Sequence, residues 1–200
     1  NGVNVHRIPP QPESPGAPVV TFVGTLKPWH GVDVLLRARA QAHKDWKLRI
    51  IGDGPMRAEL DDLARSLGID VDFRGAVAPD AIPQHMAGTA IGVAPYPAMD
   101  TDSDQYFSPL KVYEYMAAGL PVVASRVGQL PEIMGESAYL VPPSDPEALA
   151  EALDALVANP VERVQVGSDN RRQAEREHSW TGTVDHILAH AGVKEDVPHG

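Results

Sequence analysis

The sequence contains no cysteine, which excludes a disulfide framework, a thiolate metal site and a cysteine nucleophile. It is also poor in positive charge, because 17 Lys and Arg residues stand against 27 Asp and Glu residues and give a formal net charge of −10. A broad nucleic-acid interface needs basic stripes that displace counterions, so we expect no nucleic-acid partner. No apolar run approaches the ~20 residues of a membrane-spanning helix, and no signal peptide opens the chain. We therefore expect a cytoplasmic protein without a membrane span.

Short apolar runs alternate with helical patterns along the 200 residues, of which 43% are hydrophobic. This length allows one substantial core, so we expect a single domain over residues 1–200, with a proline-rich connector at 1–18 and a frayed tail at 194–200. Strands are predicted at 19–23, 46–51, 69–73, 91–94, 122–124 and 138–141, and helices at 32–42, 56–67, 82–86, 109–118, 145–157, 161–177 and 180–191. Apolar strands that alternate with helices favour an α/β fold, with a Rossmann-like parallel sheet and helices on both faces.

The most informative stretch is residues 107–125, which begins with the chemistry of a helix start. Ser108 suits an N-cap, and Pro109 suits the first helical position, where its missing N–H has no cost. Gly119 can end the helix in a left-handed conformation. The pattern predicts a helix that leads into the buried strand at 122–124.

The start of this predicted helix is a candidate anion site. The amides of Leu110 and Lys111 precede the first intrahelical hydrogen bonds, and the Lys111 side chain adds a positive charge. Glu114 lies one turn deeper and can accept hydrogen bonds from paired hydroxyl groups. A nucleotide sugar carries both kinds of group. The alternative is that Lys111 and Glu114 form a solvated surface ion pair worth under ~1 kcal/mol.

The same stretch resembles the donor-binding signature of the retaining glycosyltransferases of family 4, which have the GT-B fold. That signature has the form E-x7-E, followed by small residues and G-x-P-V-V. Glu114 matches the second glutamate and residues 116–123 read M-A-A-G-L-P-V-V, whereas the first glutamate position holds Tyr106. Residues 107–111, F-S-P-L-K, resemble a subgroup in which that departure is ordinary. The resemblance implies a metal-independent enzyme that needs no cofactor beyond its substrate, a nucleotide-diphosphate sugar.

The first loop, at residues 24–31, is similar to the G-R-L-x3-K-G loop of that family, in which an arginine and a lysine hold the diphosphate. Thr25 occupies the arginine position and His30 the lysine position, while Lys27 in the same loop restores a permanent charge. His30 could donate to phosphate even when it is neutral, because neutral imidazole keeps one N–H. Alternatively, Trp29 and His30 only pack the loop against its helix.

Other loops extend the predicted donor site. In the family, residues 52–55, G-D-G-P, correspond to a turn beside the donor pocket, and the backbone near Val77 to a surface that faces the nucleobase. A dinucleotide fingerprint fails at residues 52–57, because Arg57 stands where glycine or alanine is needed. The acidic run at 100–104 lacks the Gly and Glu of a calcium loop, since Gln105 and Lys111 hold those positions.

Together, the residues and the resemblance predict the following sites. The predicted catalytic residues are Lys27, His30, Lys111 and Glu114. The predicted donor-binding residues are Gly24, Thr25, Gly31, Gly52, Asp53, Gly54, Val77, Tyr106, Phe107, Ser108, Pro109, Leu110, Lys111 and Glu114. No metal ligand is predicted.

The resemblance also implies a missing partner. The turn at residues 1–4 resembles the crossing between the two GT-B domains, so we expect an N-terminal acceptor domain outside this chain. Peripheral membrane association could then occur through that domain. The chain alone should bind a donor nucleotide without transferring a sugar. Two further hypotheses stay open: a non-catalytic nucleotide-sugar-binding module, and a GT-B-fold nucleotide-sugar epimerase.

Overall fold

The computed structural model describes residues 2–10, 12–98, 109–135 and 139–179. Six strands form one fully parallel sheet in the order β3-β2-β1-β4-β5-β6. The strands are β1 (Val19–Val23), β2 (Lys47–Ile51), β3 (Val71–Phe73), β4 (Ile91–Ala94), β5 (Val122–Ser125) and β6 (Tyr139–Val141). This arrangement confirms the predicted Rossmann-like α/β class.

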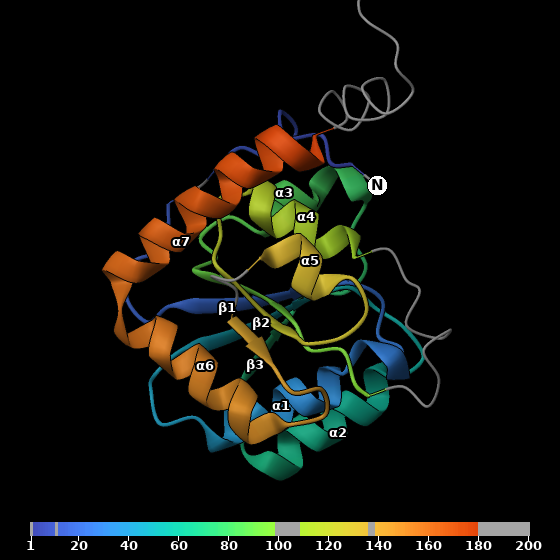
Figure 1. The fold of residues 1–200 in the computed structure, drawn as a ribbon. Helices are drawn as coiled ribbons and strands as arrows, with labels where there is room; N and C mark the ends of the chain where they lie inside the picture. Colours follow the sequence, from blue (N-terminus) through green and yellow to red (C-terminus); the bar gives the residue numbers. More distant parts are fainter. Residues whose placement is uncertain (1, 11, 99–108, 136–138, 180–200) are drawn as a thin grey trace, which may run out of the picture.

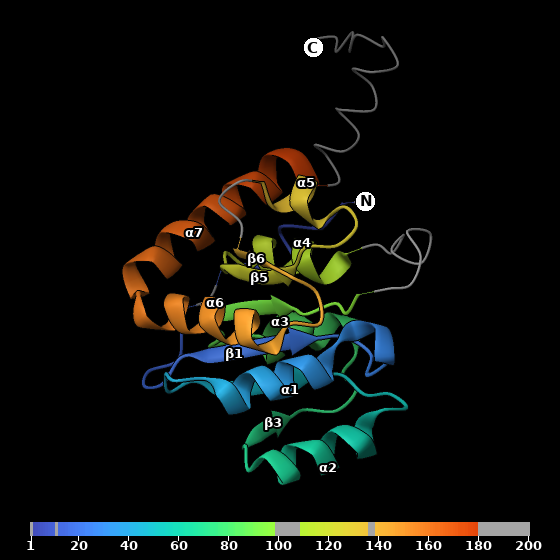
Figure 2. The ribbon, with the colours of Figure 1, turned by 60° about the horizontal axis from the view of Figure 1, so that its bottom comes forward.

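Helices cover both faces of the sheet (Figures 1 and 2). One face carries α1 (Val32–Gln41), α2 (Arg57–Leu67) and α6 (Pro146–Ala158), and the other carries α3 (Ile82–His85), α4 (Leu110–Ala117) and α5 (Leu130–Met134). Helix α7 (Pro160–Gln173) runs from the end of α6 to the side of α4 and ends in a π-helical turn, Ala174–His178. Short 3-10 turns at Pro28–His30 and Pro79–Ala81 complete the described elements.

Local signals explain several helix ends. The Asp145 carboxylate caps α6 by accepting a hydrogen bond from the Ala148 amide at 2.9 Å, as its place in the sequence predicts. Gly68 ends α2 with a φ of 66°, a left-handed conformation that glycine adopts readily. Asn159 caps α7 through the Glu162 amide.

Two details differ from the sequence-based expectations. Helix α4 begins at Leu110, and Pro109 stands at its cap position, where its carbonyl accepts from the amides of Val112 and Tyr113. The predicted cap, Ser108, lies outside the described residues, as does the predicted helix at 180–191. The short helix α5 was not predicted.

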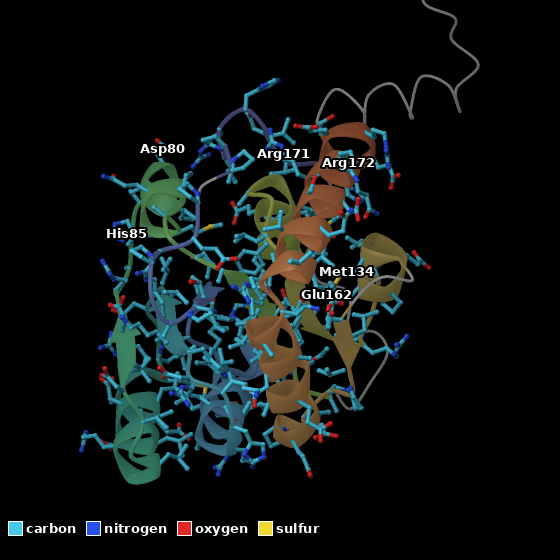
Figure 3. The ribbon with its side chains drawn as sticks, turned by 90° about the vertical axis from the view of Figure 1, so that its left-hand side faces the viewer. Asp80, His85, Met134, Glu162, Arg171 and Arg172 are labelled. Atoms are coloured by element: carbon cyan, nitrogen blue, oxygen red, sulfur yellow. The ribbon has the colours of Figure 1, made fainter. Side chains whose placement is uncertain are left out.

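The N-terminal segment packs into the domain more closely than a connector would. Val3, Val5 and Ile8 are buried in the core beside α4. The Arg171 guanidinium of α7 holds this segment, because it donates to the carbonyls of Val5 at 3.0 Å, Ile8 at 2.8 Å and Ala117 at the end of α4 (Figure 3). Among the described residues, no helix has the length and apolar character needed to cross a membrane.

Candidate functional site: the loops at the carboxyl ends of the strands

The loops after β1 and β2 lie against each other at the carboxyl edge of the sheet. The Gly24 amide donates to the Ile51 carbonyl at 2.9 Å, and the Leu26 amide donates to the Asp53 carbonyl at 3.0 Å. A Cβ at Gly52 would lie 1.8 Å from the Gly24 carbonyl oxygen, and one at Gly54 would lie 2.6 Å from the Leu26 carbonyl oxygen. Glycine at positions 52 and 54 therefore admits the neighbouring loop.

A cavity of about 220 Å³ opens between these loops and the chain that follows β3. It brings together five of the predicted donor residues: Gly24, Thr25, Gly52, Asp53 and Val77. Val23, Ile51, Ala76 and Ile82 complete its lining. The cavity is therefore mostly apolar, with the Thr25 and Asp53 side chains as its polar groups.

Lys111 is buried at the start of α4, with 8% of its surface exposed. Its Nζ lies 4.2 Å from the centre of the Phe22 ring and 4.9 Å from the centre of the Tyr96 ring. Within the described part of the chain, this nitrogen has no hydrogen-bond partner. Burial lowers the pKa of Lys111 to about 7, although the charge of Glu114 opposes the shift. The solvated surface ion pair is therefore the wrong interpretation of Lys111 and Glu114.

His30 packs beside the same cluster, with its ring centre 6.1 Å from those of Phe22 and Tyr96. Its Nδ1 contacts the Thr25 carbonyl, and since a carbonyl only accepts, this nitrogen carries the proton. Burial, followed by the charge of Lys111, lowers the pKa of His30 to about 4. The neutral ring therefore offers an acceptor at Nε2 and no free N–H for phosphate.

The rest of the first loop is more exposed. Lys27 lies over the ring of Trp29, with Nζ 4.7 Å from the ring centre, and the indole is 46% exposed. The alternative interpretation was that Trp29 and His30 both pack the loop against its helix. Only His30 packs against the protein, beside Phe22 and Tyr96, whereas Trp29 is largely exposed. Gly31 closes the loop with a φ of 63°, and a Cβ there would lie 1.8 Å from the Pro95 carbonyl oxygen.

Glu114 is half-buried on α4. Burial raises the pKa of its carboxyl group, and the charges of Arg7 and then Lys111 oppose this rise. The sequence analysis did not identify Arg7. Its guanidinium forms an ion pair with Asp80 at 3.0 Å and contacts the Pro79 carbonyl, so the turn at residues 4–7 is joined to the loop that carries Val77. Nothing in the local sequence marks this long-range contact.

Not every predicted site residue lies at the 220 Å³ cavity or among the described residues. Tyr106, Phe107 and Ser108 lie outside the described residues, as do the acidic residues at 100–104. Pro109 is buried, and Leu110 is 52% exposed at the start of α4. Across the ranges that the structure describes, no group of three or more His, Asp or Glu side chains is placed to hold a metal ion.

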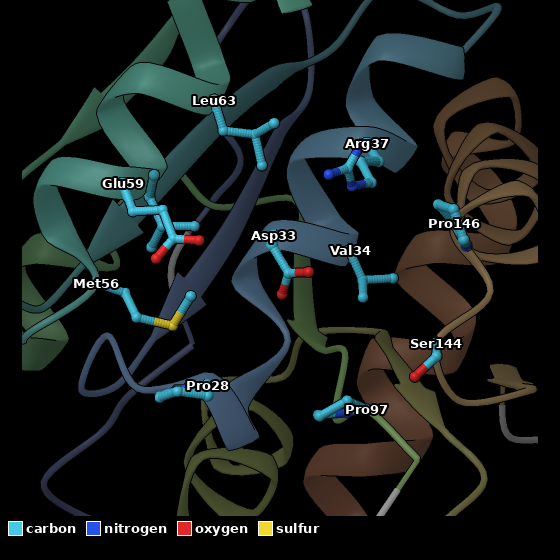
Figure 4. Close-up of a pocket in the computed structure, with 11 residues that line it drawn as sticks. Pro28, Asp33, Val34, Arg37, Met56, Glu59, Leu63, Pro97, Ser144 and Pro146 are labelled. Carbon is cyan, nitrogen blue, oxygen red and sulfur yellow. The ribbon is translucent and has the colours of Figure 1, made fainter.

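A second cavity, of about 560 Å³, lies between α1, α2 and the start of α6 (Figure 4). Asp33 and Arg37 reach it from α1, and Glu59 reaches it from α2. It contains none of the predicted donor residues, so its larger size does not make it the candidate site.

Comparisons with known proteins decide the family. The family model for glycosyl transferases group 1 matches residues 17–159. The chain belongs to this family. A D-inositol 3-phosphate glycosyltransferase from Corynebacterium kroppenstedtii is 34% identical over 86% of the chain and 39% of its own length. A GDP-mannose-dependent alpha-(1-6)-phosphatidylinositol monomannoside mannosyltransferase from Mycolicibacterium smegmatis is 28% identical over 90% of the chain and 51% of its own length.

Solved structures show the same fold. Alr3699/HepE of Anabaena in complex with UDP has a TM-score of 0.81 and 22% identity, over 97% of this chain and 56% of that one. The C-terminal domain of a group 1 family protein, LpcC of Francisella tularensis, has a TM-score of 0.73 and 20% identity, over 90% of this chain and 100% of that one. The chain thus spans about half or less of the curated relatives described above, and it has the fold of one half of a GT-B glycosyltransferase.

Proposed function

We propose that this chain is the donor-binding half of a retaining, metal-independent glycosyltransferase that uses a nucleotide-diphosphate sugar. The observation that carries the proposal is the position of Lys111, a buried lysine with no hydrogen-bond partner among the described residues, which lies against the first loop beside the 220 Å³ cavity. A cation without a partner in an apolar site is costly, so its retention is best explained by an anion that binds there. The UDP complex of the Anabaena protein and the GDP-mannose named for the mycobacterial relative support a nucleotide donor.

Each part of a nucleotide sugar then has a place. The nucleobase enters the cavity beside Val77, where backbone groups do most of the recognition. The ribose hydroxyls donate to the Glu114 carboxylate. The diphosphate lies between the first loop and the start of α4, within reach of Lys111 and Lys27.

Transfer breaks the bond between the anomeric carbon and the phosphate oxygen, and the acceptor oxygen bonds to that carbon on the same face of the sugar. The proton of the acceptor hydroxyl passes to the departing phosphate oxygen. Negative charge grows on the departing diphosphate. Lys111 and the amides at the start of α4 would stabilise this charge without a metal ion. The Nε2 of His30 would accept a hydrogen bond from a donor hydroxyl rather than donate to phosphate. The acceptor site would belong to the second domain, so we expect binding and no transfer by this chain alone.

The test is calorimetric binding of UDP and GDP to the 200-residue chain and to its Glu114→Gln variant. If Glu114 accepts from ribose, the variant should bind the preferred nucleotide about 10- to 100-fold more weakly, which is the loss of one charge-assisted hydrogen bond. Inorganic pyrophosphate, which has no ribose, should bind almost equally to both proteins.

Glu59→Gln is the matched control, because this carboxylate lines the other cavity. It should leave nucleotide binding unchanged. If the wild-type chain binds neither nucleotide, the proposed function is wrong. If Glu114→Gln weakens pyrophosphate as much as nucleotide, Glu114 does not contact the ribose.

A further inference from the structure

Strands β1 and β4 are neighbours in the sheet, but their pairing stops early. The register covers Val20↔Ile91 and Thr21↔Gly92, although β1 continues to Val23 and β4 to Ala94. On their outer sides both strands stay paired to their ends, β1 with β2 and β4 with β5. The sheet is therefore split only between β1 and β4, at its carboxyl edge.

The hydroxyl of Tyr115 on α4 occupies this split. It accepts from the Val23 amide at 2.7 Å and donates to the Val93 carbonyl at 3.3 Å. In a parallel ladder that continued with this register, the Val23 amide would donate directly to the Val93 carbonyl. One side-chain hydroxyl therefore replaces one rung of the ladder and holds the two strands apart.

The surroundings of Tyr115 fit this role. The side chain is completely buried, and burial raises its pKa well above the usual value, so the hydroxyl keeps the proton that it donates. Its ring passes over Gly92, where a Cβ would lie 2.5 Å from the ring. A phenylalanine would fill the same volume without a buried hydroxyl, so packing alone does not account for the tyrosine.

The split is also where Lys111 lies. Lys111 precedes Tyr115 by one helical turn, so both side chains project from one face of α4. The Lys111 Nζ meets Phe22 of β1 and Tyr96 beyond β4, and a Cβ at Gly24 would lie 3.1 Å from it. Parallel sheets bind ligands at such a crevice, where the chain crosses to opposite sides of the sheet on leaving adjacent strands.

We propose that Tyr115 is a positioning residue for the donor diphosphate: by replacing a rung between β1 and β4, it keeps the crevice open and holds the Gly24 loop and Lys111 in place. This inference rests on the proposed function. Tyr115 itself touches neither substrate nor reacting atoms.

Tyr115→Phe tests the inference, with Thr21→Val as the matched control. Thr21 Oγ1 and Thr89 Oγ1 form a buried hydrogen bond of 2.8 Å between the middle of β1 and the second residue before β4, on the amino side of the split. Both variants remove one buried hydroxyl and leave polar groups unpaired, so both should lower the melting temperature by similar amounts. Affinities for UDP, GDP and inorganic pyrophosphate are measured by calorimetry on each folded protein.

We expect Tyr115→Phe to weaken pyrophosphate and the preferred nucleotide about tenfold, and Thr21→Val to change either by less than about twofold. The pH profile gives a second readout. The titratable and charged groups around Lys111 among the described residues include His30, Tyr96, Glu114 and Tyr115, with Lys27 acting on His30 and Arg7 on Glu114. Lys111 should leave its buried position in Tyr115→Phe. The fall in pyrophosphate affinity near pH 7 should then shift to higher pH relative to wild type.

Gly92→Ala presses on the same ring without removing the hydroxyl, and it should cause the same selective loss of binding. It decides the matter if Tyr115→Phe does not fold. Equal binding by Tyr115→Phe and Thr21→Val, or unchanged binding by Gly92→Ala, would overturn the inference and leave the proposed function standing. A wild-type chain that binds none of the three ligands would instead refute the proposed function.

Discussion

Each edge of the sheet has a buried basic side chain nearby, and the two differ in whether that side chain has hydrogen-bond partners among the described residues. Near the amino edge, Arg163 is 5% exposed and forms four hydrogen bonds: it donates to both oxygens of Glu13 at 2.9 and 2.8 Å and to the carbonyls of Leu156 and Val157. At the carboxyl edge, Lys111 is equally buried and has no hydrogen-bond partner in the described part of the chain. A charge that serves the fold is satisfied within the fold, whereas one that awaits a ligand is not.

The largest change in stability is expected when the paired charge, Arg163, is removed. Arg163→Met leaves the Glu13 carboxylate and two carbonyls without their donor, so the free energy of unfolding should fall by about 3–5 kcal/mol. Urea denaturation measures this loss. Nucleotide affinity per folded molecule should stay unchanged, and a selective loss of affinity would mean that Arg163 also serves the ligand.

Removing the buried amine of Lys111 should have the opposite effect on stability. Lys111→Met removes a buried amine and keeps a similar shape, so the free energy of unfolding at pH 7 should rise by about 1–4 kcal/mol. Pyrophosphate affinity should fall by at least about tenfold, because the binding charge is lost. The same urea and calorimetric measurements apply, and a destabilised Lys111→Met would mean that the amine is satisfied in the native state.

The pH dependence of stability provides a control for this variant. The pKa of Lys111 is about 7 in the folded state and ordinary, near 10.5, in the unfolded chain. The unfolded state therefore binds more protons between these values, and wild-type stability should rise as pH increases from about 7 toward 10. Lys111→Met should lack this rise.

Much of the fold follows from local sequence. The structure confirms the predicted apolar strands, and the Asp145 cap and the left-handed Gly68 are likewise set by neighbouring residues. The start of α4 was misplaced, because Ser108 and Pro109 each suit a helix start and local preference does not choose between the two registers. The five-residue helix α5 is too short to show a periodic pattern.

The candidate site was only partly predictable, for a physical reason. Five of the predicted residues line one cavity, because the carboxyl ends of parallel strands share one edge. The burial of Lys111 depends on the split between β1 and β4, which in turn depends on Tyr115 and Gly92. Likewise, Arg7 reaches Asp80, which lies far from it in the sequence. Such long-range contacts leave no local signal.

We infer that the donor diphosphate is the partner that Lys111 lacks among the described residues, a claim that predicts proton uptake on nucleotide binding. Nucleotide binding is measured by calorimetry at pH 8 in two buffers with different ionisation enthalpies, using whichever of UDP and GDP binds better. At that pH the phosphates are already ionised, while Lys111, with a pKa of about 7, is mostly neutral. Wild type should take up close to one proton per nucleotide and Lys111→Met none. Equal uptake by the two proteins would contradict the claim.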